Sequence, residues 1–201
     1  MQKIKKRKIV SAKECKHDLK PHLELLFYAV DQGIDKYNQI LSLFPVESRA
    51  RALEANILNS KIIEAIQGSF SENWKFGKYR RFILRVNGYN ILFKKLKNND
   101  MPMNVRTKHV EAIENQYQLS LFENTSFSEV IEPIVFLGYK KDKWGTIIDT
   151  KLVYIDEGEI KWTISQSDIT EEKNIVINPL STNQPQISVR PQIRKGVKKS
   201  V

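Results

Sequence analysis

The dipeptide Asn87-Gly88 constrains the fold of this chain more than any other feature of its sequence. The run RRFILRV precedes it and the run YNILFKKL follows it, and both are rich in residues that favour strands. Asn-Gly between two such runs favours a type I′ turn and therefore a two-residue β-hairpin. The turn also sets the register, and the predicted cross-strand pairs are Val86 with Tyr89, Leu84 with Ile91, and Phe82 with Phe93.

The two faces of this hairpin differ in character, because successive side chains of a strand point to opposite sides. One face is wholly apolar, and we predict that it is buried against helices; it consists of Phe82, Leu84, Val86, Tyr89, Ile91 and Phe93. The other face is predicted to be a basic surface with two aliphatic residues among the charges; it consists of Arg81, Ile83, Arg85, Asn90, Leu92 and Lys94.

A pair of helices is predicted before the hairpin. Over residues 21–44, apolar residues recur at steps of three and four, which is typical of a helix with one buried face. Gly33 permits a kink or an early end within this segment, and Pro45 ends it. A second helix is predicted from about 47 to 67, with Gly68 as its stop, so that the two form an antiparallel pair.

The elements predicted after the hairpin complete an α+β fold. They are a third, shorter helix over about 106–117 and strands over 134–139, 147–155 and 159–164. We therefore predict an N-terminal helix pair packed on an antiparallel sheet of about five strands, with flexible basic termini. The predicted division is a basic arm over 1–20, a single α+β domain over 21–166 and a flexible basic tail over 167–201.

The positive charge of the chain is unevenly distributed. The whole sequence has a net charge of +10, whereas residues 1–20 carry +6 and residues 186–201 carry +5. Residues 75–97 hold eight Lys or Arg and no acid. The part of the chain outside these three basic segments is therefore acidic. A segregated basic surface attracts polyanions, or an acidic protein, through long-range electrostatics.

The hairpin and its flanks are therefore the predicted binding surface. Arginine and lysine pair with phosphates, and an exposed aromatic ring can stack on a base. The candidate partner-binding residues are Arg80, Arg81, Arg85, Lys94, Lys95 and Lys97, with the aromatic residues Trp74 and Tyr79. The predicted partner is nucleic acid or an acidic protein.

A metal-dependent nuclease of the restriction-endonuclease type is an alternative. Asp149 followed by Glu159-Ile-Lys161 matches an acid on one strand and Glu-x-Lys on the next, which could hold Mg²⁺. A turn at 156–158 would place Glu159 opposite Ile155 and would separate it from Asp149 by roughly 20 Å along the sheet. That separation argues against a shared metal unless a bulge or a displaced turn changes the register.

The sequence contains no motif that is typical of other function classes. It has no Walker or G-x-G-x-x-G loop and no HExxH or CxxC motif, so we predict no cofactor and no metal besides the alternative Mg²⁺. It has no apolar run long enough for a membrane span, and no apolar stretch follows its basic start, so we predict neither a membrane segment nor a secretory signal. The single cysteine, Cys15, suits a reducing, cytoplasmic setting.

Four segments give the chain a likeness to other proteins between about Arg51 and Gln166. They are ALEANILNSKIIEAI, the hairpin ending in LFKKL, MPMNVRTKHVEAIENQ with QLSLF after it, and LGYKKDKWGTII with VYIDEGEIKW. In these segments the chain resembles a group of small uncharacterised bacterial accessory proteins. The resemblance implies a role beside helix-turn-helix regulators in toxin–antitoxin or phage-defence systems. It carries no catalytic motif and transfers no functional residue.

The leading hypothesis is a non-enzymatic binding protein of a bacterial regulatory, toxin–antitoxin or phage-defence system. The nuclease is one alternative, and a protein–protein interaction module with no nucleic-acid role is another. The sequence leaves open the oligomeric state and whether the termini become ordered on binding.

Overall fold

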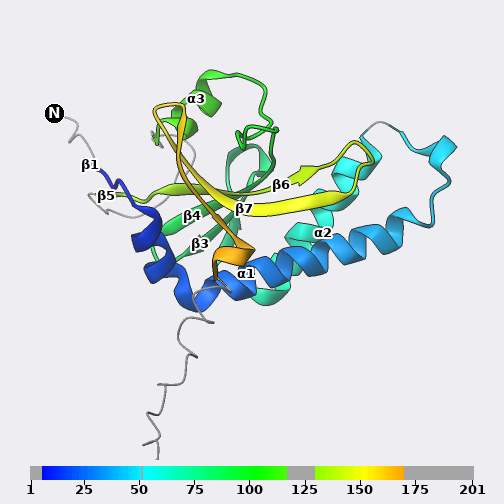
Figure 1. The fold of residues 1–201 in the computed structure, drawn as a ribbon, viewed down its shortest axis with the longest axis horizontal. Coiled ribbons are helices and arrows are strands. Elements are labelled where there is room, and N and C mark those ends of the chain that lie inside the picture. The colour runs from blue at the N-terminus through cyan, green and yellow to red at the C-terminus, as the bar shows by residue number, and fades with distance from the viewer. Residues whose placement is uncertain (1–5, 51, 117–129, 170–201) are drawn as a thin grey trace, which may run out of the picture.

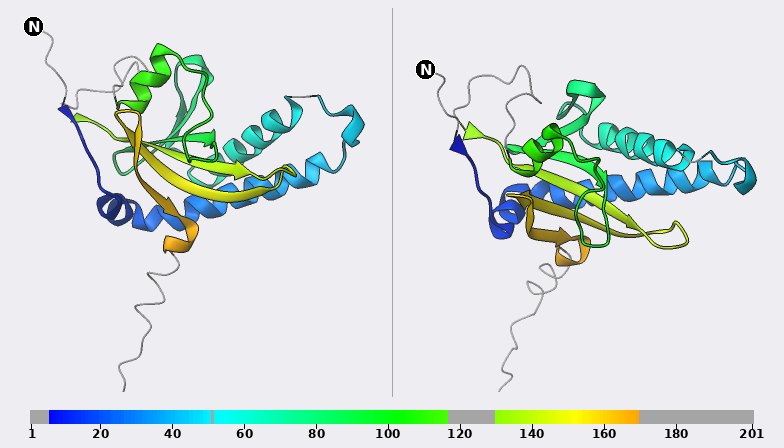
Figure 2. Two further views of the ribbon diagram at one scale, coloured as in Figure 1. Left: turned by 45° about the horizontal axis from the view of Figure 1, so that its top comes forward. Right: turned by 90° about the horizontal axis from the view of Figure 1, so that it is seen from above.

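The computed structural model describes residues 6–50, 52–116 and 130–169. Two helices, α1 (Ala12–Leu41) and α2 (Leu53–Ser69), lie side by side against one face of a sheet. A third helix, α3 (Lys108–Glu114), lies by the other face (Figure 1). Two further views show the same layers, with the helix pair and α3 on opposite sides (Figure 2). The α+β class predicted from the sequence is therefore confirmed.

The long helix α1 begins earlier than predicted. Ser11 and Glu14 form a capping box at its start: the Ser11 hydroxyl accepts from the Glu14 amide at 3.2 Å, and the Glu14 carboxylate accepts from the Ser11 amide at 2.8 Å. Residues 12–20, assigned above to the basic arm, thus form the first turns of α1, and Pro21 lies inside the helix. Cys15 and Leu19 are buried, so the apolar stripe continues through the proline.

The contact between α1 and α2 explains the glycine in α1. A Cβ atom at Gly33 would lie 2.8 Å from the Ile62 Cα, so the two helix backbones approach too closely there for any side chain. The glycine neither kinks nor ends the helix, as the sequence had allowed, but lets the pair pack. A 3₁₀ turn, Val46–Ser48, occupies part of the connection, and α2 therefore begins at Leu53 and not near residue 47.

Six strands form the main sheet in the order β2-β3-β4-β6-β7-β8. Their bounds are β2 Trp74–Phe76, β3 Phe82–Val86, β4 Tyr89–Lys95, β6 Ile134–Lys141, β7 Ile147–Asp156 and β8 Glu159–Ser165. Neighbouring strands are antiparallel except β4 and β6, which are parallel. A separate two-stranded parallel sheet joins β1 (Lys6–Arg7) to β5 (Val130–Ile131).

The prediction of about five antiparallel strands is wrong in two respects. The extra strand, β2, has three residues and is too short to show an alternating pattern. The parallel pair arises because the segment between β4 and β6 contains α3 and crosses the sheet. Such a crossover returns the chain to the end at which β4 began, so β6 runs in the same direction as β4.

The hairpin itself forms as the Asn-Gly dipeptide predicts. Asn87 and Gly88 have φ values of 46° and 78°, as a type I′ turn requires. The predicted partners Val86 and Tyr89 pair, as do Leu84 and Ile91, and the rings of Phe82 and Phe93 have centroids 5.6 Å apart. The apolar face is buried in the main core with residues of α1 and α2, as predicted.

The opposite face of the hairpin was predicted to be a basic surface with two aliphatic residues among the charges, and it is instead buried over part of its length. Ile83 and Leu92 are 1% and 2% exposed and pack with Ile113 of α3 in a second apolar cluster. The cause is the crossover, because it places α3 over this face. The sheet is thus covered on both sides near its middle, and solvent reaches this face of the hairpin only toward its ends.

The last hairpin differs from its prediction in register. Its turn is Glu157-Gly158, so Glu159 pairs with Asp156 and not with Ile155. A bulge between Tyr154 and Ile155 then shifts the pairing. Ile160 therefore packs against the α3-side cluster.

None of the helices described within residues 6–50, 52–116 and 130–169 combines the length and the apolar content that a bilayer crossing requires.

Candidate anion-binding surface

Two cations of the predicted site, Arg81 and Lys94, lie together on the α3 side of the sheet. Arg81 directly precedes β3, and Lys94 lies near the end of β4, so both belong to the open end of the hairpin. The pairing of Leu84 with Ile91, continued along the strands, places Arg81 opposite Lys94. Both side chains are half-buried. The hairpin thus brings two positive charges together at one end of its α3 face.

No described carboxylate forms an ion pair with this couple. Burial lowers the pKa of the Arg81 guanidinium, and its Nη1 atom is buried without a hydrogen-bond partner. Burial also lowers the pKa of the Lys94 ammonium group, and the charge of Arg81 lowers it further. Two partly desolvated like charges with no counterion destabilise each other, and a bound anion would relieve that repulsion.

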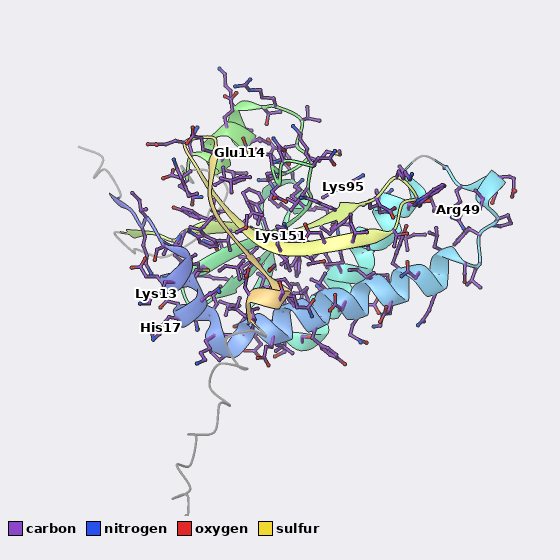
Figure 3. All side chains as sticks on the ribbon, viewed as in Figure 1. Lys13, His17, Arg49, Lys95, Glu114 and Lys151 are labelled. Atoms are coloured by element: carbon purple, nitrogen blue, oxygen red, sulfur yellow. The ribbon has the colours of Figure 1, made fainter. Side chains whose placement is uncertain are left out.

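Cations elsewhere on the same side of the sheet are neutralised. Lys140 and Lys151 both contact Asp100, with Nζ to Oδ1 distances of 2.6 and 3.4 Å. Lys151, labelled in Figure 3, also lies 2.8 Å from Asp149. Burial opposes the ionisation of Asp100, but the two lysines outweigh it and hold the pKa of that carboxyl group below its ordinary value. The couple formed by Arg81 and Lys94 is therefore distinctive.

Arg85 does not belong to the free positive surface that the sequence predicted. It lies at the turn end of β3, and its guanidinium pairs with the Glu132 carboxylate, to which its Nε donates at 3.1 Å. Asn90 donates to the other Glu132 oxygen, also at 3.1 Å. Glu132 precedes β6 and is distant in sequence, so no local pattern indicated this neutralisation.

The other predicted residues divide between the two sides of the sheet. Strand alternation directs Lys95, labelled in Figure 3, toward the helix side. Trp74 is half-buried against the main core and stands opposite Leu84. Arg80 and Lys97 are exposed, beside Arg81 and just beyond β4 respectively, and neither forms an ion pair with a described residue. We define the cationic surface as Tyr79, Arg80, Arg81, Lys94 and Lys97.

Tyr79 gives this surface an exposed aromatic ring. It lies in the 3₁₀ turn Lys78–Arg80 and is 73% exposed. Tyr79 and Arg80 have φ values of 59° and 54°, so two consecutive residues other than glycine adopt the left-handed conformation. That conformation costs about 1–2 kcal/mol per residue. The ring centroid lies 6.2 Å from that of His109 on α3, and the two planes are inclined at 60°.

The alternative nuclease residues are not brought together. Asp149 lies near the start of β7 and contacts Lys151, whereas Glu159 begins β8 and pairs with Asp156 at the far end of β7. The seven residue steps from Asp149 to Asp156 span roughly 23 Å in a strand. The Lys161 ammonium lies 3.3 Å from the Glu159 carboxylate. Among the described residues, no three His, Cys, Asp or Glu side chains are grouped as metal ligands.

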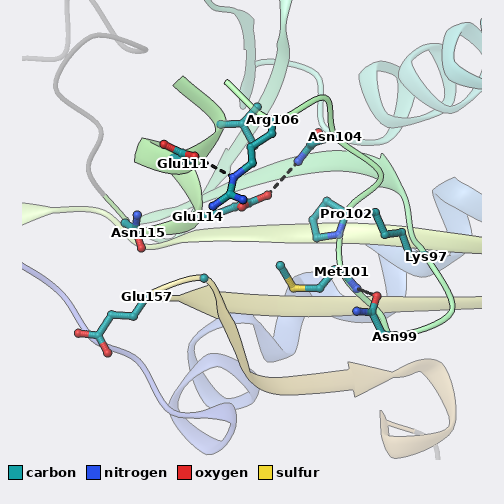
Figure 4. Close-up of a pocket in the computed structure, with 12 residues that line it drawn as sticks. Lys97, Asn99, Met101, Pro102, Asn104, Arg106, Glu111, Glu114, Asn115 and Glu157 are labelled. Carbon is teal, nitrogen blue, oxygen red and sulfur yellow. Dashed lines mark hydrogen bonds and ion pairs between the residues drawn. The ribbon is translucent and has the colours of Figure 1, made fainter. Parts of the chain in front are cut away.

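A polar groove beside α3 was not predicted from the sequence (Figure 4). It has a volume of about 710 Å³ and lies between the loop that follows β4, α3 and the β7–β8 turn. Arg106 and Glu111 form an ion pair across it at 2.9 Å, and Asn104 donates to Glu114 at 3.3 Å. Lys97 of the cationic surface also lines this groove, so the two features adjoin.

Cys15 is unsuited to nucleophilic chemistry. It lies on the core-facing side of α1 and is fully buried. Burial raises the pKa of its thiol to about 12, and the negative charge of Asp18 also raises it. A nucleophilic cysteine requires the thiolate, which is scarce at neutral pH at such a site.

Comparisons of the chain with protein-family models, with curated proteins and with solved structures find no match.

Proposed function

We propose that this protein is a non-enzymatic binding protein for nucleic acid, which it engages through the cationic surface. The observation that carries the proposal is the couple of Arg81 and Lys94, half-buried together with no carboxylate partner among the described residues. A phosphate group between them would supply the missing negative charge. Guanidinium and ammonium groups both bind phosphate strongly, and the guanidinium can do so with two hydrogen bonds.

Nucleic acid fits the surface better than an acidic protein does, because an exposed aromatic ring accompanies the cations. Tyr79 provides a planar face next to Arg80 and Arg81. Nucleobases stack on such rings, whereas the carboxylates of an acidic protein gain nothing comparable from one. The basic segments 1–20 and 186–201 would add affinity that does not depend on nucleotide sequence.

The experiment measures binding of a fluorescent oligonucleotide by anisotropy at several salt concentrations. The test variant is R81Q/K94Q, and K36Q/K143Q is the matched control, since it removes two positive charges elsewhere on the chain. We expect the test variant to bind at least about tenfold more weakly at moderate salt, and the slope of log affinity against log salt to flatten by more than one. The control variant should fall far less.

Two outcomes would contradict the proposal. Equal losses in both variants would show that net charge alone governs binding and that the cationic surface has no special part. Equally tight binding of polyglutamate to the wild-type chain, with the same loss in R81Q/K94Q, would favour an acidic protein partner.

We extend the proposal to a cellular role in bacterial regulation, toxin–antitoxin action or phage defence, as the resemblance of residues 51–166 implies. Sequencing of the nucleic acid that co-purifies with the native chain tests this role. Enrichment of one transcript or operator would support it, and recovery of bulk cellular nucleic acid in proportion to abundance would not.

A further inference from the structure

The aromatic ring at the cationic surface narrows the class of nucleic acid. We infer that the surface binds single-stranded nucleic acid, with an unpaired base stacked on Tyr79 and the adjoining phosphate held by Arg81 and Lys94. This inference rests on the proposed function and adds the strandedness of the ligand.

The exposure of Tyr79 is maintained by a backbone that is unfavourable for its sequence. The turn Lys78–Arg80 holds two consecutive non-glycine residues at positive φ. Strained conformations of this kind persist only where the surrounding fold enforces them, and they concentrate at functional sites. Here the turn separates Tyr79 from the aromatic cluster of Phe76 and Phe82, whose rings pack 5.6 Å apart. An aromatic side chain that could have joined that cluster is 73% exposed instead.

His109 supports the ring from one side. It belongs to α3, and its edge-on contact with Tyr79 fixes the ring beside the α3 face of the sheet. That is the face on which strand alternation places Arg81 and Lys94. The ring and the two cations thus lie on one side of the molecule. The ring is 73% exposed, so a base can reach it from solvent.

A single strand is favoured because the Tyr79 ring can reach the face of a base only where that base is unstacked. In a duplex, each base is covered above and below by its neighbours, and a side chain reaches a base face only after unstacking it. In a single strand, the base faces are accessible, and stacking on an aromatic side chain favours binding regardless of base identity. The cationic surface combines positive charge with the exposed ring of Tyr79, which His109 contacts. This combination suits an unpaired strand.

The experiment compares a labelled single-stranded dodecamer with the corresponding 12-base-pair duplex at one salt concentration. We expect Y79A to weaken binding of the single strand about 5- to 100-fold and to leave duplex binding unchanged. Y79F keeps the ring and should bind as wild type does. F76A removes a nearby, 50% exposed ring on the helix side of the sheet and should not alter binding of either probe.

An abasic dodecamer tests the stacking contact from the ligand side. If a base stacks on Tyr79, removal of the bases weakens wild-type binding and removes the difference between wild type and Y79A. This comparison keeps the inference testable even if Y79A changes the local fold, because the wild-type chain then provides the readout.

The experiments distinguish a failure of the strandedness inference from a failure of the proposed function. If R81Q/K94Q weakens binding while Y79A lowers affinity for both probes equally, or for neither, the strandedness inference is overturned and the proposed function stands. If wild type binds neither probe in a way that depends on Arg81 and Lys94, the proposed function fails as well.

Discussion

The two faces of the central sheet are covered in different ways, and the difference locates the candidate site. On the helix side, α1 and α2 cover the sheet with one large apolar cluster that includes Phe27, Leu58 and Tyr154. On the α3 side, a seven-residue helix and its loops cover a smaller cluster, and charged side chains begin where that cluster ends. The helix side also holds charge, but there Lys141 is paired with Glu54 of α2, whereas Arg81 and Lys94 on the α3 side have no such partner among the described residues.

The α3 face is itself divided. Its charges toward β7 form a network in which Lys140 and Lys151 share Asp100 and Asp149. Its charges at the open end of the hairpin are Arg81 and Lys94, for which the described part of the chain supplies no carboxylate partner. The comparison therefore separates charges that stabilise the fold from charges that are available to a partner.

The largest expected effect tests the helix side. Phe27 is 1% exposed in the main core, and Phe27→Ala should lower the free energy of unfolding by about 3–5 kcal/mol, because it leaves a large cavity. Tyr28 is the next residue and is 59% exposed, so Tyr28→Ala should change stability by less than about 0.5 kcal/mol. Chemical denaturation of both variants measures the difference. Similar losses for the two variants would show that this face is not the main core.

A smaller effect tests how α3 is attached. The buried Gln116 amide donates to the Ile134 and Ile155 carbonyls at 3.1 and 2.6 Å, and its oxygen accepts from the Ile134 amide at 2.8 Å. Gln116→Ala leaves these buried groups unsatisfied, so we expect a loss of about 2–4 kcal/mol. Hydrogen exchange at the Ile134 amide should accelerate strongly in this variant. Gln39→Ala, at an exposed position of α1, is the control, and unchanged exchange in Gln116→Ala would contradict the assignment.

The smallest expected effect has the opposite sign. The pKa of Lys94 is lowered in the folded state, so its charged form destabilises the fold, and Lys94→Met should raise stability while it weakens binding. A gain on the order of 1 kcal/mol would raise Tm by about 2–4 °C. In wild type, stability from this group should rise as pH increases from the lowered pKa toward 10.5, and the rise should be absent in the variant. Lys97→Met, at an exposed position, should leave Tm unchanged; a lower Tm in Lys94→Met would show that this cation is compensated.

The sequence predicted elements best where the signal is local. The Asn87-Gly88 turn and the pairing of Leu84 with Ile91 follow from dihedral preference and strand alternation, and both are confirmed. The start of α1 lies earlier than predicted because Ser11 caps the helix and Cys15 and Leu19 extend its apolar stripe ahead of Pro21. That error could have been avoided from the sequence.

The candidate site divides in the same way. The sequence indicated Arg81, Lys94 and Tyr79 because they belong to a basic, acid-free segment that is predicted to contain a hairpin. It also selected Arg85 and Trp74. In the fold, Glu132 neutralises Arg85, and Trp74 is half-buried against the main core. Nothing near these residues in the sequence reveals their partners, since the contacts join segments that are distant along the chain.

Backbone preference, side-chain period and composition specify a hairpin with one apolar face, two preceding helices and a concentration of positive charge. The parallel pairing of β6 with β4, and the position of α3 over the middle of the basic face, arise instead from contacts between distant segments. The direction of a strand depends on the path of its connection and not on its own residues. That path left Arg81 and Lys94 without a counterion among the residues that the structure describes, and it left Tyr79 exposed.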